Sequence, residues 1–186
     1  MSIEPSSFIP GRRIPVVRRH EPAGSSPGTL RPDDAARRPR VVAIGYGPDG
    51  HLERELESTE EIQELRTAWP VVWLNVEGLE HHGTISEIGA IFGMHRLAIE
   101  DIVNVPQRAK TEPYDDHLFV IARMAEYVDR LRTEQVSLFV GKGFVVTFQE
   151  RTGDSFDQVR RRLESVGGRL RRAGADYLAY ALIDAL

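Results

Sequence analysis

Apolar runs in two separate regions of the chain predict β-strands. In both regions the runs are four to eight residues long and are bounded by turn-forming or polar residues. We expect strands in "VVAIGYGPDG" (41–50, ending in a turn), "HLERELE" (51–57, a polar edge strand), "VVWLNVEG" (71–78), "HLFVIARMAEYV" (117–128), "EQVSLFVGK" (134–142) and "GFVVTFQE" (143–150). Val136, Leu138 and Val140 would lie on one face of their strand and Phe139 on the other. Apolar residues on both faces indicate a central strand covered on both sides.

A helical period predicts five helices, which lie between and after these strands. They are "STEEIQELRTA" (58–68), "TISEIGAIFG" (84–93), "LAIEDIV" (97–103), "DSFDQVRRRLESVGG" (154–168) and "ADYLAYALIDAL" (175–186). Capping boxes, Ser58 with Glu61 and Thr84 with Glu87, predict where the first two begin. Pro106 ends the third helix, and Pro113 predicts that the connector after it is irregular.

The last two helices should each bury one stripe of side chains. The predicted stripes are Phe156, Val159, Leu163 and Val166 in the fourth, and Leu178, Ala179, Leu182 and Leu186 in the fifth. Tyr177, Ala181 and Asp184 would lie on another face of the fifth helix. Strands and helices in this order predict an α/β protein, a three-layer α/β/α sandwich with a mixed β-sheet.

Composition divides the chain into three parts. Residues 1–40 are rich in Pro, Gly and Arg and show no period, so we expect a disordered tail. Residues 41–174 should form the α/β/α domain, and residues 175–186 the start of a helix that has no stop signal. The chain has 186 residues, 41% of them hydrophobic, which is enough for a sizeable core.

Several classes of function are disfavoured. No apolar run approaches the roughly 18 residues that span a bilayer, and no signal peptide is evident, so the chain alone is expected to be soluble. There is no cysteine, which excludes disulfides and thiolate metal sites. Phosphate-binding loops and common hydrolase motifs are absent, so we expect no enzyme. The arginines of the tail lack interleaved aromatic residues, which disfavours nucleic acid as a partner.

Three pairs of adjacent residues are candidates for metal binding. His81 and His82 would point in different directions on a helix, so we expect a solvated loop there. Asp115 and Asp116 are expected to form a polar entrance to a strand. Glu100 and Asp101 lie away from the predicted buried face formed by Ile99, Ile102 and Val103. Two carboxylates can hold Mg²⁺ only with retained waters or with acids from elsewhere, such as a second subunit; a solvated helix face is the other interpretation.

Five separated blocks of sequence resemble the cytosolic domain of the CorA family of magnesium and cobalt transporters. The blocks are "WLNVEG" (73–78), "IEDIVNVPQRAKTEPYDDHLFVI" (99–121), "TEQVSLFVGKGFVVTFQER" (133–151), "GDSFDQVRRRLE" (153–164) and "ADYLAYALIDAL" (175–186). The resemblance runs from about Val71 to Leu186 and is weaker from Val41. The family pattern has Gln-Arg-Pro-Lys where this chain has Ala109 in place of the proline.

The resemblance implies a homopentameric membrane transporter at the cell inner membrane, with this domain on the cytoplasmic face. It implies that Mg²⁺ or Co²⁺, the transported ion, also binds between neighbouring cytosolic domains and holds the channel closed. Carried over to this chain, the metal-binding residues are Glu100, Asp101 and Asp184. The family's stalk, membrane helices and Gly-Met-Asn signature are absent from the sequence. The alternative is a soluble protein-interaction module of the same fold without a metal role.

Overall fold

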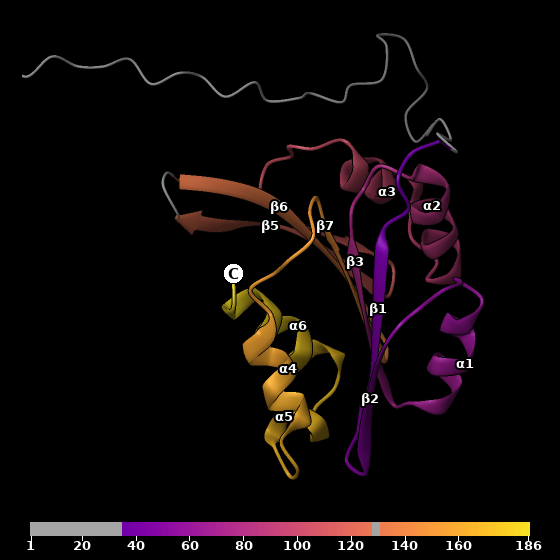
Figure 1. The fold of residues 1–186 in the computed structure, drawn as a ribbon, viewed down its shortest axis with the longest axis vertical. Coiled ribbons are helices and arrows are strands. Elements are labelled where there is room, and N and C mark those ends of the chain that lie inside the picture. The colour runs from indigo at the N-terminus through magenta and orange to yellow at the C-terminus, as the bar shows by residue number, and fades with distance from the viewer. Residues whose placement is uncertain (1–34, 128–130) are drawn as a thin grey trace, which may run out of the picture.

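A single mixed sheet forms the centre of the protein in a computed structural model that describes residues 35–127 and 131–186 (Figure 1). Its seven strands are in the order β2-β1-β3-β7-β6-β5-β4. The strands are β1 (Arg40–Gly47), β2 (Gly50–Glu55), β3 (Val71–Glu77), β4 (Lys110–Tyr114), β5 (His117–Tyr127), β6 (Leu131–Gly141) and β7 (Phe144–Gln149). The helices are α1 (Glu61–Ala68), α2 (His82–Ile91), α3 (Arg96–Val103), α4 (Asp157–Glu164), α5 (Arg169–Arg172) and α6 (Ala175–Asp184).

Helices cover both faces of this sheet. Figure 1 shows α1, α2 and α3 on one side and α4, α5 and α6 on the other. The strands β3 and β7 pair in parallel at the centre, whereas the other neighbours are antiparallel. The predicted three-layer α/β/α sandwich with a mixed β-sheet is therefore confirmed. The edge strand β2 is mostly exposed, as its polar sequence indicates.

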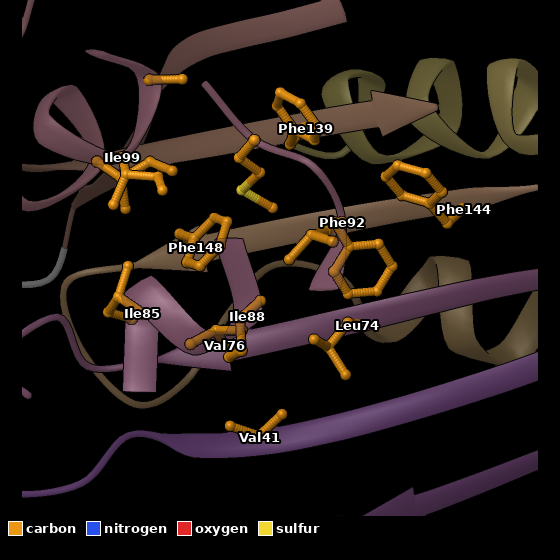
Figure 2. Packing of buried hydrophobic residues seen from close by; sticks show 14 of the residues in the cluster. Val41, Leu74, Val76, Ile85, Ile88, Phe92, Ile99, Phe139, Phe144 and Phe148 are labelled. Atoms are coloured by element: carbon orange, nitrogen blue, oxygen red, sulfur yellow. The ribbon is translucent and has the colours of Figure 1, made fainter. Parts of the chain in front are cut away.

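Two apolar cores lie on opposite faces of the sheet because successive strand residues point in opposite directions. Beneath α1–α3, Ile85 and Ile88 lie near Val76 and Phe148 (Figure 2). The ring centroids of Phe92 and Phe144 are 4.7 Å apart in the same core. Beneath α4–α6, the ring of Phe156 meets Trp73 edge-on at 5.6 Å. The central strands supply both cores, which explains why their sequences are apolar on both faces.

The predicted helix starts are correct in part. Glu61 accepts hydrogen bonds from the backbone N–H groups of Ser58 and Glu57, at 3.1 and 2.9 Å, which is half of the predicted capping box. Thr84 is not a cap. The helix α2 starts earlier, and the Nδ1 atom of His81 accepts a hydrogen bond from the Thr84 N–H at 3.1 Å. His81 is buried by this role, so the prediction of a solvated loop was wrong for it.

The connector after α3 is more regular than predicted. Lys110–Tyr114 form strand β4, which pairs with β5. Pro113 fits there because β4 is an edge strand and has no neighbour on its outer side. Asp115 and Asp116 lie in the turn that enters β5, as expected, and both are exposed.

The C-terminal helical layer is also divided differently. The helix α4 ends at Glu164, so Val166 is 88% exposed rather than part of the buried stripe. The short helix α5 follows, which was not predicted. Ala181 is buried with Leu178 and Leu182, so the apolar face of α6 is wider than the predicted stripe. Most of the predicted tail, residues 1–34, lies outside the described residues.

Candidate metal-binding carboxylates

The helix α3 places Glu100 and Asp101 at the margin of one core. The apolar residues on one face of this helix, Ile99, Ile102 and Val103, are buried, as predicted. The ring of His95 caps the helix by accepting a hydrogen bond from the Leu97 N–H at 3.2 Å. With one face of this two-turn helix packed on the sheet, both carboxylates are left only partly buried. Their location is consistent with a surface site and not with a core ion pair.

Asp101 belongs to a group of three charged side chains that joins α3 to β4. The ammonium group of Lys110 donates a hydrogen bond of 2.8 Å to Asp101 and another of 2.8 Å to Glu112. Burial lowers the pKa of Lys110, but the two carboxylates outweigh this and raise it above its usual value. The hydrogen bond from Lys110 lowers the pKa of Glu112. We call Asp101, Lys110 and Glu112 the α3–β4 charge cluster.

Lys110 and Glu112 were not among the candidate residues of the sequence. They lie two positions apart, so in a strand they occupy the same face. That signal was present in "KTEPY", but Pro113 led to an irregular connector being predicted instead. The side chains of Asp101 and Lys110 are 22% and 29% exposed, so solvent and dissolved ions reach the cluster.

The third predicted ligand, Asp184, lies on the opposite side of the sheet. It is the last residue of α6, is exposed, and makes no ion pair with a residue in the described ranges. Since α3 and α6 cover different faces (Figure 1), one protomer does not bring Asp184 together with Glu100 and Asp101. Within residues 35–127 and 131–186 there is no group of three or more His, Asp or Glu side chains arranged to hold a metal ion.

A second charged group lies partly buried at the start of α4. Arg160 donates two hydrogen bonds to Asp154, at 2.6 and 2.7 Å, and Asp154 also accepts one from the Phe156 N–H at 2.8 Å. Burial alone would raise the pKa of Asp154, but Arg160 and this N–H lower it. The pair is therefore ionised and enclosed, which is typical of a structural ion pair.

Amide side chains connect this pair to the centre of the sheet. The Nδ2 group of Asn75 donates to Asp154 at 3.0 Å and to Glu77 at 3.1 Å. Its Oδ1 atom accepts from the hydroxyl of Thr147 at 2.6 Å, and that hydroxyl accepts from Trp73 Nε1 at 2.9 Å. This network explains polar residues within the otherwise apolar "VVWLNVE" strand, for which the sequence alone suggested no role.

Comparison with known proteins identifies the family. The sequence profile described as CorA-like Mg²⁺ transporter protein matches residues 70–186, which is more than half of the chain. The chain belongs to the CorA-like Mg²⁺ transporter family. The cobalt/magnesium transport protein CorA of Thermotoga maritima is 36% identical over 167 residues, 88% of this chain. The aligned region is 48% of that relative, so this CorA-like chain spans about half of its length.

Solved structures agree with the fold. The soluble domain of CorA from Methanocaldococcus jannaschii superimposes with a TM-score of 0.55 and 10% identity, covering 78% of this CorA-like chain and 54% of that one. The cytoplasmic domain of ZntB from Vibrio parahaemolyticus gives a TM-score of 0.57 and 16% identity, covering 81% and 58%. In the described residues, no helix is both long and apolar enough to cross a membrane.

Proposed function

We propose that this chain is the regulatory, cation-sensing domain of a CorA-type magnesium or cobalt transporter. In this proposal it belongs to a homopentamer at the cell inner membrane and faces the cytoplasm. Mg²⁺ or Co²⁺ binds between protomers through Glu100, Asp101 and Asp184, and the bound ion favours the closed channel. The single observation that supports it best is the state of Asp101 in this CorA-like chain. Its carboxylate is partly exposed and binds the ammonium group of Lys110, a cation on a flexible side chain that a metal ion could replace.

The separation of the three carboxylates favours a site shared between protomers. Asp184 lies across the sheet from Asp101, so the two could meet only when α6 of one protomer approaches α3 of another. Such an approach would put like charges together, and their repulsion would be relieved by a dication. Mg²⁺ keeps several of its waters, so two or three carboxylates are a sufficient protein contribution.

Lys110 gives the site a second state. In the single protomer its ammonium group neutralises Asp101, so a divalent ion has to displace it or share the carboxylate with it. A ligand shifts the balance between open and closed arrangements only by its difference in affinity for the two. Competition with Lys110 would weaken metal binding and so raise the ion concentration at which the channel closes.

The test is protection of the assembled transporter from proteolysis by Mg²⁺. The Asp101→Asn variant removes one carboxylate charge while keeping the shape of the side chain, so it should need at least about tenfold more Mg²⁺ for equal protection. Asp116→Asn is the matched control, because Asp116 is an exposed aspartate in a turn and should leave protection unchanged. Equal Mg²⁺ requirements for the wild-type protein and Asp101→Asn would refute the sensor assignment.

A further inference from the structure

A cavity of about 510 Å³ lies at the end of the sheet where β3 and β7 begin. Four connections line it: the turn between β1 and β2, the link from α1 to β3, the turn between β6 and β7, and the link from α5 to α6. This is far along the strands from the amide network, since β3 starts at Val71 beside the cavity and reaches Glu77 at its other end. Nothing in the proposed cation site involves these residues.

The charged residues that line this cavity are all basic. They are Lys142, Arg171 and Arg172, and no Asp or Glu is among the lining residues. Two exposed acids lie beside the lining in the sequence, Asp49 next to Pro48 and Asp176 in the first turn of α6, and neither is among the lining residues. Arg172 donates a hydrogen bond of 2.7 Å to the carbonyl of Gly167, which leaves the charge of its guanidinium group uncompensated. The lining residues themselves therefore carry a net positive charge.

Arg171 is the residue that most strongly indicates a ligand in this cavity. Its side chain and backbone together are only 5% exposed, and its Nε–H is sealed from solvent without an acceptor. Among the described residues it has no hydrogen bond or ion pair. Its two terminal nitrogens are not sealed in this way, so they are open to a ligand. A cation that has lost much of its hydration and has no counter-charge destabilises a folded protein. By contrast Arg160, whose side chain is 16% exposed, has the carboxylate of Asp154 at 2.6 Å. An arginine in the situation of Arg171 indicates that an anion from outside the chain completes the site.

The start of α6 adds a second source of positive potential. This helix has ten residues, and its N-cap, Gly174, supplies no side-chain acceptor for the backbone N–H groups of the first turn. Gly174 and Ala175 both line the cavity. The first-turn N–H groups and the helix dipole favour a negatively charged group at this position, where the carboxylate of Asp176, beside Gly174, supplies part of that charge.

We propose that this cavity binds a phosphate group, with Arg171 as its principal ligand and Lys142, Arg172 and the first turn of α6 as its other contacts. An arginine fork matches the geometry of a tetrahedral oxyanion and can donate two parallel hydrogen bonds to it. The cavity volume is within the range of small-molecule sites. The other lining residues are glycine, proline, valine and alanine, whose side chains cannot donate hydrogen bonds to a second part of the ligand. The site would therefore recognise the phosphate group itself, which free phosphate and a small phosphomonoester share.

The test measures phosphate binding to the full chain by calorimetry in a chloride buffer without divalent cations. We expect saturable binding by wild type, and at least about a tenfold loss of affinity in Arg171→Met, since a charge-assisted pair is removed. The control is Arg161→Met, which removes an exposed arginine of α4 that does not line the cavity. It should bind phosphate as wild type does.

Two further measurements separate binding from folding. In the phosphate-free buffer Arg171→Met should unfold at the same or a higher temperature than wild type, because it removes an unpaired buried charge. Should this variant fail to fold, Lys142→Met replaces it, since Lys142 is exposed, and a severalfold loss of affinity is expected. A titration with glycerol phosphate distinguishes an esterified ligand, which would bind more tightly than inorganic phosphate, from free phosphate. Absence of saturable binding of both, or equal affinities in wild type and Arg171→Met, would overturn the proposal.

Discussion

The two faces of the sheet hold their aspartates in different ways. Beneath α4, the carboxylate of Asp154 is 3% exposed and is fixed by Arg160, Asn75 and a backbone N–H. At the margin of α3, Asp101 is 22% exposed and its carboxylate has one described partner, Lys110. Breaking a buried ion pair whose hydrogen bonds are all made strongly destabilises the folded protein. An exposed ion pair contributes little to stability, and its members can exchange partners. The first aspartate therefore suits a structural role and the second a role in binding.

The largest effect is expected from breaking the buried pair. The substitution Asp154→Asn removes the most buried counter-charge of Arg160 and leaves only the more exposed Glu53 and Asp157 near its guanidinium group, which should lower the free energy of unfolding by about 3–5 kcal/mol. Denaturation by urea measures this loss. The control is Asp157→Asn, because Asp157 also pairs with Arg160, at 3.2 Å, but is 75% exposed. That control should cost less than about 1 kcal/mol, and equal losses in the two variants would contradict the comparison.

The same pair predicts how stability depends on pH. The pKa of Asp154 is lower in the folded protein than in the unfolded chain, so its contribution is complete above the unfolded pKa of about 3.9. It is lost as the pH falls through the lower folded pKa. The difference in unfolding free energy between wild type and Asp154→Asn should therefore stay constant near neutral pH and shrink below about pH 4. Urea titrations at several pH values measure it. A difference that grows on acidification would show that the assigned pKa direction is wrong.

A smaller effect is expected inside the amide network. Thr147→Val keeps the shape of the side chain but leaves Trp73 Nε1, which donates to Thr147 at 2.9 Å, buried without an acceptor. The loss should be about 1–3 kcal/mol, the cost of an unsatisfied buried donor. Urea denaturation measures this loss of stability, and near-ultraviolet circular dichroism reports the change in the surroundings of Trp73. Thr67→Val is the control, since Thr67 is an exposed helix residue whose hydroxyl bonds only to a backbone carbonyl at 3.0 Å. A loss no larger than that of the control would mean that the network contributes little.

The fold was more predictable from the sequence than either aspartate's surroundings. Periodicity identifies strands such as Val71–Glu77 because both faces are buried, and it identifies α3 because its apolar residues recur every three to four positions. It fails at Lys110–Tyr114, where a proline is tolerated only because the strand lies at the edge of the sheet. Edge position is a property of the complete sheet, which a local pattern does not contain.

Contacts between residues that are distant in the sequence were the other feature that the sequence alone did not predict. The resemblance to CorA suggested Glu100, Asp101 and Asp184 as ligands, and this remains a prediction. The pairing of Asp101 with Lys110 depends on how α3 lies over β4, and that of Asn75 with Asp154 joins residues 79 positions apart. Arg171 could not be recognised at all, because an arginine in "RLRR" would ordinarily be assigned to a solvated surface.

The smallest effect on stability, and the one that tests the comparison from the side of function, is expected from Lys110→Met. Because the pair with Asp101 is partly exposed, this variant should change the unfolding free energy by no more than about 1 kcal/mol. In the proposed cation site it also removes the cation that would compete with a divalent ion, so the proposed assembly should need about threefold to tenfold less Mg²⁺ for protection from proteolysis.

Two variants sharpen this last prediction. Arg108→Met removes an exposed positive charge from the same connector and should leave the Mg²⁺ requirement nearly unchanged. Lys110→Met combined with Asp101→Asn should lose the gain, because the carboxylate that Lys110 occupies is no longer charged. A higher Mg²⁺ requirement in Lys110→Met would mean that the ammonium group orients Asp101 for the metal instead of competing with it. In that case the exposed pair would be a fixed part of the site, and the contrast with the buried pair of Asp154 and Arg160 would no longer hold.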